Sequence, residues 1–344
     1  MVCGSGRKSY CLTGAYAFPL MSEACSQGRS IGSKTCSQGR SIGSETCSRS
    51  WTPQHPLDYR AVLAPLRRGR GDPTMRMDAD GTVWRAGTTP VGAATLALRR
   101  DDAGTVHATG WGLGAAWALE GLPTLLGAGD DDSAFVPHHP LIAQARLRAP
   151  GLRLGATRRV WDVLVPAVLE QKVTGVEARR SWRELCWRFG EPAPGPVELW
   201  VPPGPAAVRA IPDWEWHRAG VDRTRRRALL AAAAVAHRLE GAVTLAGKAG
   251  RDLLCKVPGI GIWTAAEVAQ RAWADADAVS VGDFHIPSVV GYALLGRPLD
   301  DAGMLEVLAP YAPQRQRAVR YIEASGFRRP RFGPRLHPRD YRAM

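Results

Sequence analysis

The chain of 344 residues has no run of 18 or more apolar residues, which excludes a conventional membrane-spanning helix. It also has few cysteines: there are seven, an odd number, and only Cys186 and Cys255 lie beyond residue 50. Neither stands at the spacing of a disulfide framework or of a zinc site. The weakly apolar start is interrupted by Gly14 and Pro19, so we read no secretion signal. We therefore expect a protein of the reducing cytoplasm.

Acidic residues are scarce relative to basic ones: 32 Asp and Glu stand against 45 Lys and Arg, which gives a net charge of +13. Residues 1–50 hold only six of the basic and two of the acidic residues, so most of the excess belongs to the remainder of the chain. A basic body favours a polyanionic partner, although charge alone does not establish one. The length and the 45% of hydrophobic residues are enough for two or three packed subdomains.

The first 50 residues contain an internal repeat. The segment 25–33 recurs without change as 36–44, and Thr46-Cys47-Ser48 begins a third copy at the same period of 11 residues. These copies are rich in Ser and Gly and have almost no apolar side chains, so they cannot offset the entropy of ordering. We predict a disordered tail over residues 1–50. A zinc site formed by Cys25, Cys36 and Cys47 is a poor alternative, because no Cys-x-x-Cys pair is present.

Alternating short segments separated by turn residues predict a small antiparallel sheet between about residues 72 and 112. Ala94, Leu96 and Leu98 would share one face of a strand there. Helical periodicity begins near residue 113 and dominates beyond residue 158, where apolar residues recur at positions i, i+3, i+4 and i+7. The helices that we expect are about 160–171, 176–189, 224–239, 251–256, 263–273, 284–295 and 314–325.

The most informative segment joins two of these helices. One helix stops at Pro258, Gly259 and Gly261 form a tight turn that side chains would obstruct, and the next helix begins at once. The free amide groups at the start of that helix are suited to binding an anion, and the glycines would let a phosphate backbone approach. Taken alone, this segment is also compatible with an ordinary helix-helix corner.

The wider motif, from Leu254 through Val257-Pro-Gly-Ile-Gly261 to Trp263-Thr264-Ala265, resembles the hairpin of the helix-hairpin-helix/Gly-Pro-Asp DNA glycosylase superfamily. The bacterial 3-methyladenine DNA glycosylase II type is the most similar. The resemblance implies that a DNA-binding hairpin is formed by Val257, Pro258, Gly259, Ile260, Gly261 and Thr264. It also implies that main-chain carbonyls of Cys255, Val257 and Gly259 could hold a structural monovalent cation.

The same resemblance implies that Asp283, 20 residues after Trp263, is the catalytic carboxylate. A carboxylate suits glycosidic cleavage because positive charge builds on the sugar in the transition state. Relatives that also cut the DNA backbone carry a lysine where this chain has Trp263, so we expect no lyase activity. No cysteine follows Cys255, so we expect no iron-sulfur cluster. Locally, Gly282-Asp283 before a helix is also typical of an N-cap, and the two roles can coexist.

Further site residues follow from the same resemblance. Trp263 and Phe284 are candidates for the walls of a base pocket, although Phe284 is equally compatible with core packing. Gln171 and Lys172 are candidates for a wedge that fills the gap left by a flipped base. Two basic and aromatic clusters have simpler interpretations: we expect core packing for Trp214, Trp216 and His217, and a solvated helix start for Arg225-Arg-Arg227.

The sequence thus predicts an α+β, mainly α fold, with the helical domains of a helix-hairpin-helix DNA glycosylase at 151–327 and the hairpin at about 251–273. An antiparallel sheet with helices would occupy 51–150, and tails 1–50 and 328–344. The resemblance implies a monofunctional DNA glycosylase of base excision repair, which flips out alkylated bases of the 3-methyladenine type in duplex DNA and hydrolyses their N-glycosidic bond. We expect a monomer that requires no cofactor and contacts no membrane. Two alternatives stay open: a glycosylase for deaminated, oxidised or mismatched bases, and a helix-hairpin-helix protein that binds DNA without chemistry.

Overall fold

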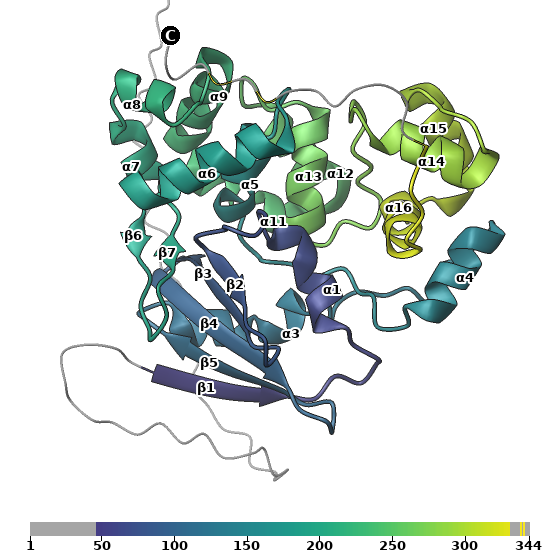
Figure 1. The fold of residues 1–344 in the computed structure, drawn as a ribbon, viewed down its shortest axis with the longest axis horizontal. Coiled ribbons are helices and arrows are strands. Elements are labelled where there is room, and N and C mark those ends of the chain that lie inside the picture. The colour runs from purple at the N-terminus through teal and green to yellow at the C-terminus, as the bar shows by residue number, and fades with distance from the viewer. Residues whose placement is uncertain (1–45, 331–337, 339, 341–344) are drawn as a thin grey trace, which may run out of the picture. The chain divides into compact units, whose positions relative to one another are not determined.

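A five-stranded antiparallel sheet occupies the N-terminal part of the residues that the computed structural model describes, which are 46–330, 338 and 340 (Figure 1). The strand order is β1-β5-β4-β3-β2. Four of these strands confirm the sheet predicted between residues 72 and 112. The bounds of the strands are β1 Thr46–Trp51, β2 Met75–Met77, β3 Val83–Thr89, β4 Gly92–Arg100 and β5 Val106–Trp111.

Strand β1 corrects the predicted extent of the N-terminal tail. Its six residues pair along their whole length with β5, from Thr46 opposite Trp111 to Trp51 opposite Val106. Cys47 and Trp51 are partly buried against the sheet's core, and the Arg49 guanidinium donates to the carbonyls of Leu119 and Glu120. An unpaired edge of β5 thus gives the polar third repeat copy its hydrogen bonds. The rest of the predicted tail, including Cys25 and Cys36, lies outside the described residues.

Apolar side chains on one face of the sheet form a core with three short helices, α1 (Tyr59–Leu63), α2 (Ala115–Glu120) and α3 (Leu122–Leu125). Alternate positions of β4, Leu96 and Leu98, are buried in this core, as the period of two predicts. The small hairpin of β6 (Glu191–Pro192) and β7 (Trp200–Val201) packs on β3 around Ala86.

A second core is mainly helical and contains the predicted hairpin segment. Helix α5 lies at its centre, buried along its entire length, and packs against α6, α9 and α13. The helices of this part are α5 Trp161–Leu169, α6 Gly175–Phe189, α7 Pro205–Ala210, α8 Asp213–Arg218, α9 Arg223–Ala234, α10 Ala236–Leu239, α11 Ala242–Leu245, α12 Gly247–Cys255 and α13 Ile262–Ala272.

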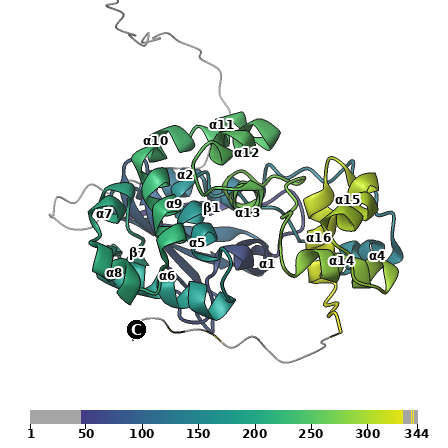
Figure 2. The ribbon, with the colours of Figure 1, turned by 90° about the horizontal axis from the view of Figure 1, so that it is seen from above.

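A third core joins segments far apart in the sequence. Helix α4 (Pro140–Arg148) lies beside α16 (Arg315–Ala324), near α14 (Ile286–Leu295) and α15 (Asp301–Leu308) (Figures 1 and 2). Its buried residues run from Phe135 to Leu152 and then from Val279 to Ile322. The structure therefore departs from the domain boundary expected at residue 150, because the last 20 residues before it pack with the C-terminal helices.

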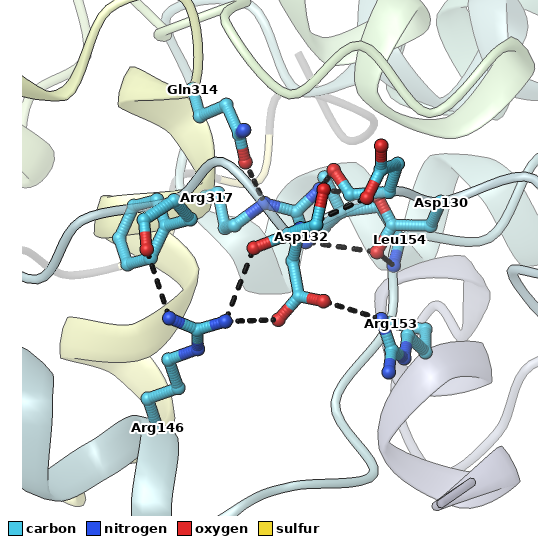
Figure 3. A network of polar contacts seen from close by, with 10 residues as sticks. Asp130, Asp132, Arg146, Arg153, Leu154, Gln314 and Arg317 are labelled. Atoms are coloured by element: carbon cyan, nitrogen blue, oxygen red, sulfur yellow. Dashed lines mark hydrogen bonds and ion pairs between the residues drawn. The ribbon is translucent and has the colours of Figure 1, made fainter. Parts of the chain in front are cut away.

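An ion-pair network fixes this third core (Figure 3). The Arg317 guanidinium, almost fully buried, donates to both carboxylate oxygens of Asp130, and Asp130 also accepts the amide N–H of Leu154. Asp132 binds Arg146 at 3.2 Å and Arg153 at 2.8 Å. A buried charge needs such partners, since an unpaired one costs several kcal/mol. The acidic residues that start at Asp130 thus connect α4 and α16, because they form ion pairs with an arginine of each helix.

The predicted fold class, α+β and mainly α with a small N-terminal antiparallel sheet, is confirmed. Within the part of the chain that the structure describes, no single helix is long and apolar enough to cross a membrane. One bent pair, α9 with α10–α11, has the length and composition but turns by 78°.

Candidate active site

The hairpin between α12 and α13 is built as the sequence predicts, with α12 ending at Cys255 and α13 starting at Ile262. The side chains of Val257, Ile260 and Thr264 are buried in the second core, whereas Pro258 and both glycines are exposed. The buried side chains anchor the turn from inside the protein. The hairpin therefore offers its main chain, rather than these three side chains, to a ligand in solvent.

The two glycines of the hairpin are required for different reasons. Gly259 has a φ of +88°, and a Cβ atom there would lie 2.6 Å from the Cβ atom of Ala228 in α9. A side chain at Gly259 would be both strained and obstructed. Gly261 has extended backbone with a φ of −93°, and a Cβ atom there would meet no atom within 4 Å. The expected obstruction inside the protein is thus wrong for Gly261, whose open side faces solvent.

The first turn of α13 has amide donors that the helix itself does not use. Gly261 is the N-cap residue and has no side chain to accept from them. The first N–H groups of any α-helix have no intrahelical acceptor, and the helix dipole makes this end attractive to an anion. Ile262, at the first position of the helix, is 65% exposed. The start of α13 is therefore an accessible, uncapped set of donors.

The loop between α5 and α6, residues 170–174, lies directly against the hairpin. The side-chain amide of Gln171 donates to the carbonyl oxygen of Gly259 at 2.9 Å and to the hydroxyl oxygen of Thr264 at 2.8 Å. The next residue, Lys172, is exposed and has a φ of +54°, a conformation that L-residues rarely adopt. The structure thus places the loop with the two predicted wedge residues at the hairpin, where Gln171 is held by two hydrogen bonds and Lys172 is exposed.

Two buried arginines hold the base of this loop, and the sequence analysis did not identify their roles. Arg225 is only 4% exposed, and its guanidinium donates to the carbonyls of Leu169 and Gly220 and to Asp222. The prediction of a solvated helix start is therefore wrong for Arg225. Its guanidinium is buried because it donates to a carbonyl at the end of α5, that of Leu169. Arg68 is likewise buried and pairs with Glu170 at 3.0 Å. Burial lowers the pKa of Arg68, and the charges of Glu170 and Glu267 oppose that shift.

Asp283 lies between α13 and α14 and is half-buried. Its Oδ1 atom accepts the backbone N–H groups of His285 at 2.7 Å and Ile286 at 2.9 Å. Its Oδ2 atom accepts the indole N–H of Trp263 at 3.0 Å. Because a carboxylate oxygen accepts about two hydrogen bonds, Oδ1 is saturated and Oδ2 keeps one lone-pair position. The N-cap residue of α14 is His285, so Asp283 is not the predicted N-cap. One of its oxygens still holds the backbone where α14 starts, and the other keeps one position available.

Trp263 and Phe284 differ in their surroundings. Trp263 is half-buried, and its indole is held in place by the hydrogen bond to Asp283. Phe284 is 76% exposed and makes an edge contact with the ring of His285, at 5.0 Å between centroids. Core packing, one of the two readings of Phe284, is therefore wrong. The His285 ring in turn contacts Arg329, from the segment after α16.

The second aromatic cluster divides in the same way. Trp216 is fully buried and donates its indole N–H to the carbonyl of Ile211, which confirms core packing. Trp214 is 59% exposed, and core packing is wrong for it. His217 is exposed too.

The carbonyls proposed for a monovalent cation are partly engaged by protein donors. Val257 O accepts the N–H of Ile260 at 3.0 Å, and Gly259 O accepts from Gln171. A cation would have to share two of its three oxygens with these donors, each oxygen having one lone pair left.

Comparison with known proteins identifies solved structures with a similar fold, but no match by sequence to a family model or a curated protein. No family model matches the sequence, and no curated protein matches it either. Among solved structures, 3-methyladenine DNA glycosylase from Archaeoglobus fulgidus superposes with a TM-score of 0.67 at 15% identity, over 81% of this chain and 98% of that one. The 8-oxoguanine glycosylase/lyase of Clostridium acetobutylicum superposes with a TM-score of 0.64 at 10% identity, over 83% and 99%.

A second structure of the Clostridium enzyme contains double-stranded DNA with cytosine opposite 8-oxoguanine, and it superposes with a TM-score of 0.61 at 8% identity, over 78% and 91% of the two chains. Nearly the whole length of each of these enzymes is thus matched by this chain. The chain has the fold of the helix-hairpin-helix/Gly-Pro-Asp DNA glycosylases.

Proposed function

We propose that this chain is a monofunctional DNA glycosylase that hydrolyses the N-glycosidic bond of alkylated bases, of the 3-methyladenine type, in duplex DNA during base excision repair. One observation carries the proposal: a single helix, α13, joins the three parts of such a site. Its uncapped start follows the hairpin. Its Thr264 accepts from Gln171, which lies in the loop of the predicted wedge residues, 170–174. Its Trp263 donates to Asp283.

Binding of DNA is supported by the start of α13 and by the charge of the chain. Exposed amide donors next to Gly261 suit a phosphate oxygen, which needs no base-specific contact. The net charge of +13 adds sequence-independent attraction. Lys172, exposed at the tip of the loop that Gln171 fastens to the hairpin, would enter the space left by an extruded nucleotide.

Asp283 would act on the sugar and on water. Cleavage of the glycosidic bond develops positive charge on the deoxyribose, and a fixed carboxylate lowers the energy of that state. The free position on Oδ2 is the one that can orient or deprotonate the attacking water. An alkylated purine is already a cationic leaving group, so a strong acid is less necessary. Its ring would stack against the indole of Trp263 or the exposed Phe284.

Hydrolysis without a lyase step is supported by the residue at position 263. A covalent amine intermediate needs a lysine at that position, and the indole of Trp263 has no nucleophile to offer. The base would therefore be released, and the sugar would stay in the DNA as an intact abasic site with both strands unbroken.

The experiment that tests the function measures base release from duplexes that contain one 3-methyladenine, 7-methylguanine, hypoxanthine, uracil or 8-oxoguanine. We expect release of the alkylated purines, no strand cleavage, and no covalent complex with borohydride. Release of 8-oxoguanine or uracil alone would assign the other base class. Binding of DNA with no release from any duplex would make the chain a binding protein and would overturn the proposal.

Trp263→Phe separates the two roles proposed for Trp263, because it keeps an aromatic ring and removes the N–H that binds Asp283. A hydrogen bond to a charged group contributes about 1.5–3 kcal/mol, so we expect the single-turnover rate of base release to fall roughly 10- to 100-fold. The dissociation constant for damaged duplex should change little. Trp214→Phe, at an exposed tryptophan of α8, is the matched control and should keep the wild-type rate. An unchanged rate in Trp263→Phe would show that the indole N–H is not needed.

A further inference from the structure

One face of α13 carries three polar or amphipathic side chains, Trp263, Glu267 and Gln270, at positions i, i+4 and i+7. Most of the other residues of this helix are small and buried, namely Thr264, Ala265, Ala266, Val268, Ala269 and Ala272. All three side chains point to the segment 274–283, which connects α13 with α14. Trp263 binds Asp283, Glu267 accepts the hydroxyl of Ser280, and Gln270 donates to the same hydroxyl and to the carbonyl of Ala278.

Before Asp283 itself, Ser280 is the last residue of the segment that forms hydrogen bonds with this face of α13. It is buried, and its hydroxyl donates to Glu267 while it accepts from Gln270 at 2.9 Å. Its carbonyl accepts the backbone N–H of Asp283 at 3.2 Å. A displacement of Ser280 would therefore be passed directly to the backbone of Asp283, three residues further on.

Glu267 is itself held firmly, as a positioning residue must be. Its second carboxylate oxygen binds the Arg271 guanidinium at 2.8 Å, and Arg271 also donates to the Glu267 carbonyl. Both side chains are largely buried, at 13% and 14% exposure. In such surroundings a hydrogen bond to a charged oxygen is strong, and one left unmade is costly. The anchored carboxylate thus serves as a fixed point for the hydroxyl of Ser280.

Other contacts also hold the segment, in addition to the hydrogen bonds that Asp283 Oδ1 accepts from His285 and Ile286. Asp275 pairs with Arg251 of α12, Asp277 pairs with Arg315 of α16, and the N–H of Gly282 binds Asp301 of α15. These contacts set where the segment runs. Gly282 has a φ of +89°, and a Cβ there would meet no described atom within 4 Å, so its hydrogen bond to Asp301 holds this residue rather than side-chain packing.

We propose that Glu267 is a positioning residue that, through Ser280, holds Asp283 at hydrogen-bonding distance from Trp263. Its effect on base release rests on the proposed function, whereas its effect on the Trp263–Asp283 bond does not. Without the Glu267 carboxylate or the Ser280 hydroxyl, the segment 274–283 can move. The indole of Trp263 then loses Asp283 as its hydrogen-bond acceptor.

Two readouts test this proposal with Glu267→Ala, Glu267→Gln and Ser280→Ala. The first is the indole N–H signal of Trp263 in a spectrum of ¹⁵N-tryptophan protein, assigned by its loss in Trp263→Phe. We expect this signal to shift and to exchange faster with water in Glu267→Ala and Ser280→Ala. Of the 12 tryptophans, those whose indoles do not contact the segment 274–283 should keep their positions, whereas Trp273, which binds Asp275, is not a reference. Glu267→Gln keeps an acceptor oxygen for Ser280 and should restore most of the wild-type signal.

The second readout is the single-turnover rate of base release, measured beside the dissociation constant for DNA. We expect Glu267→Ala and Ser280→Ala each to lower the rate by roughly tenfold with unchanged affinity, the size of one lost hydrogen bond to a charged group. The double variant should be no slower than either single one, because both remove the same link. Glu306→Gln, at an exposed glutamate of α15, is the control and should match the wild type in both readouts.

The outcomes separate this inference from the proposed function. If the wild-type chain releases no base, the function fails, and the indole signal alone decides the inference. If Glu267→Ala does not fold, Ser280→Ala decides it, since that variant leaves the Glu267–Arg271 pair intact. An unchanged Trp263 signal in Ser280→Ala would overturn the proposal, as would a rate loss caused entirely by weaker DNA binding.

Discussion

Asp283→Asn should bind damaged duplex as tightly as the wild type and release its base at least roughly 10²- to 10³-fold more slowly, the scale of losing one fixed group that stabilises transition-state charge. The amide oxygen of Asn can keep the place of Oδ1 and accept from His285 and Ile286. Its NH₂ group then faces the indole N–H of Trp263, donor against donor. The substitution removes both the negative charge and the acceptor, Oδ2, that would orient or deprotonate the attacking water. Single-turnover release and a separate binding titration measure the two effects.

Asp300→Asn is the matched control for that variant. Asp300 is exposed and caps α15 by accepting the N–H of Gly303, so the change removes the same charge from a helix start outside the proposed site. We expect it to keep the wild-type rate. Asp283→Ala should differ from Asp283→Asn in stability, because it also loses the two backbone hydrogen bonds at the start of α14, at about 1 kcal/mol. If Asp283→Asn kept a tenth or more of the wild-type rate, Asp283 would hold the start of α14 without a catalytic role.

The features that could be predicted from the sequence are those with a local pattern. The glycines of the hairpin, the period of α5 and the alternation of β4 each follow from neighbouring residues, and all lie where they were expected. Trp263 and Asp283 are 20 residues apart, and only the resemblance placed them in one site. Their direct hydrogen bond is a finding of the structure.

The features that were missed depend on partners far away in the chain. Arg225 is buried because the carbonyl of Leu169, 56 residues earlier, accepts from it. Gln171 reaches a carbonyl 88 residues later, at Gly259. Strand β1 has no apolar run and forms because β5 offers an unpaired edge. No local pattern encodes such pairings, since a side chain's burial is decided by which distant backbone groups need a donor.

The two hairpin glycines should give opposite results when each is changed to alanine. Gly259→Ala places a side chain at a φ of +88° and within 2.6 Å of Ala228. The strain and the crowding together should lower the free energy of unfolding by about 2 to 4 kcal/mol. Gly261→Ala meets no atom within 4 Å and keeps an ordinary φ, so the free energy of unfolding should stay within about 0.5 kcal/mol of the wild type. Urea denaturation measures both.

Gly261→Ala, the variant expected to keep its stability, should be the one that loses affinity for DNA. A methyl group on Gly261 would stand in front of the free amides of α13, and we expect the dissociation constant for duplex DNA to rise roughly tenfold, as for the loss of a hydrogen bond to a charged phosphate. The slope of affinity against salt concentration should not change, because no cation is removed. Wild-type affinity in Gly261→Ala would place the phosphate elsewhere. Reduced affinity with unchanged stability would instead show that Gly261 serves the approach of the DNA backbone rather than the packing of the described residues.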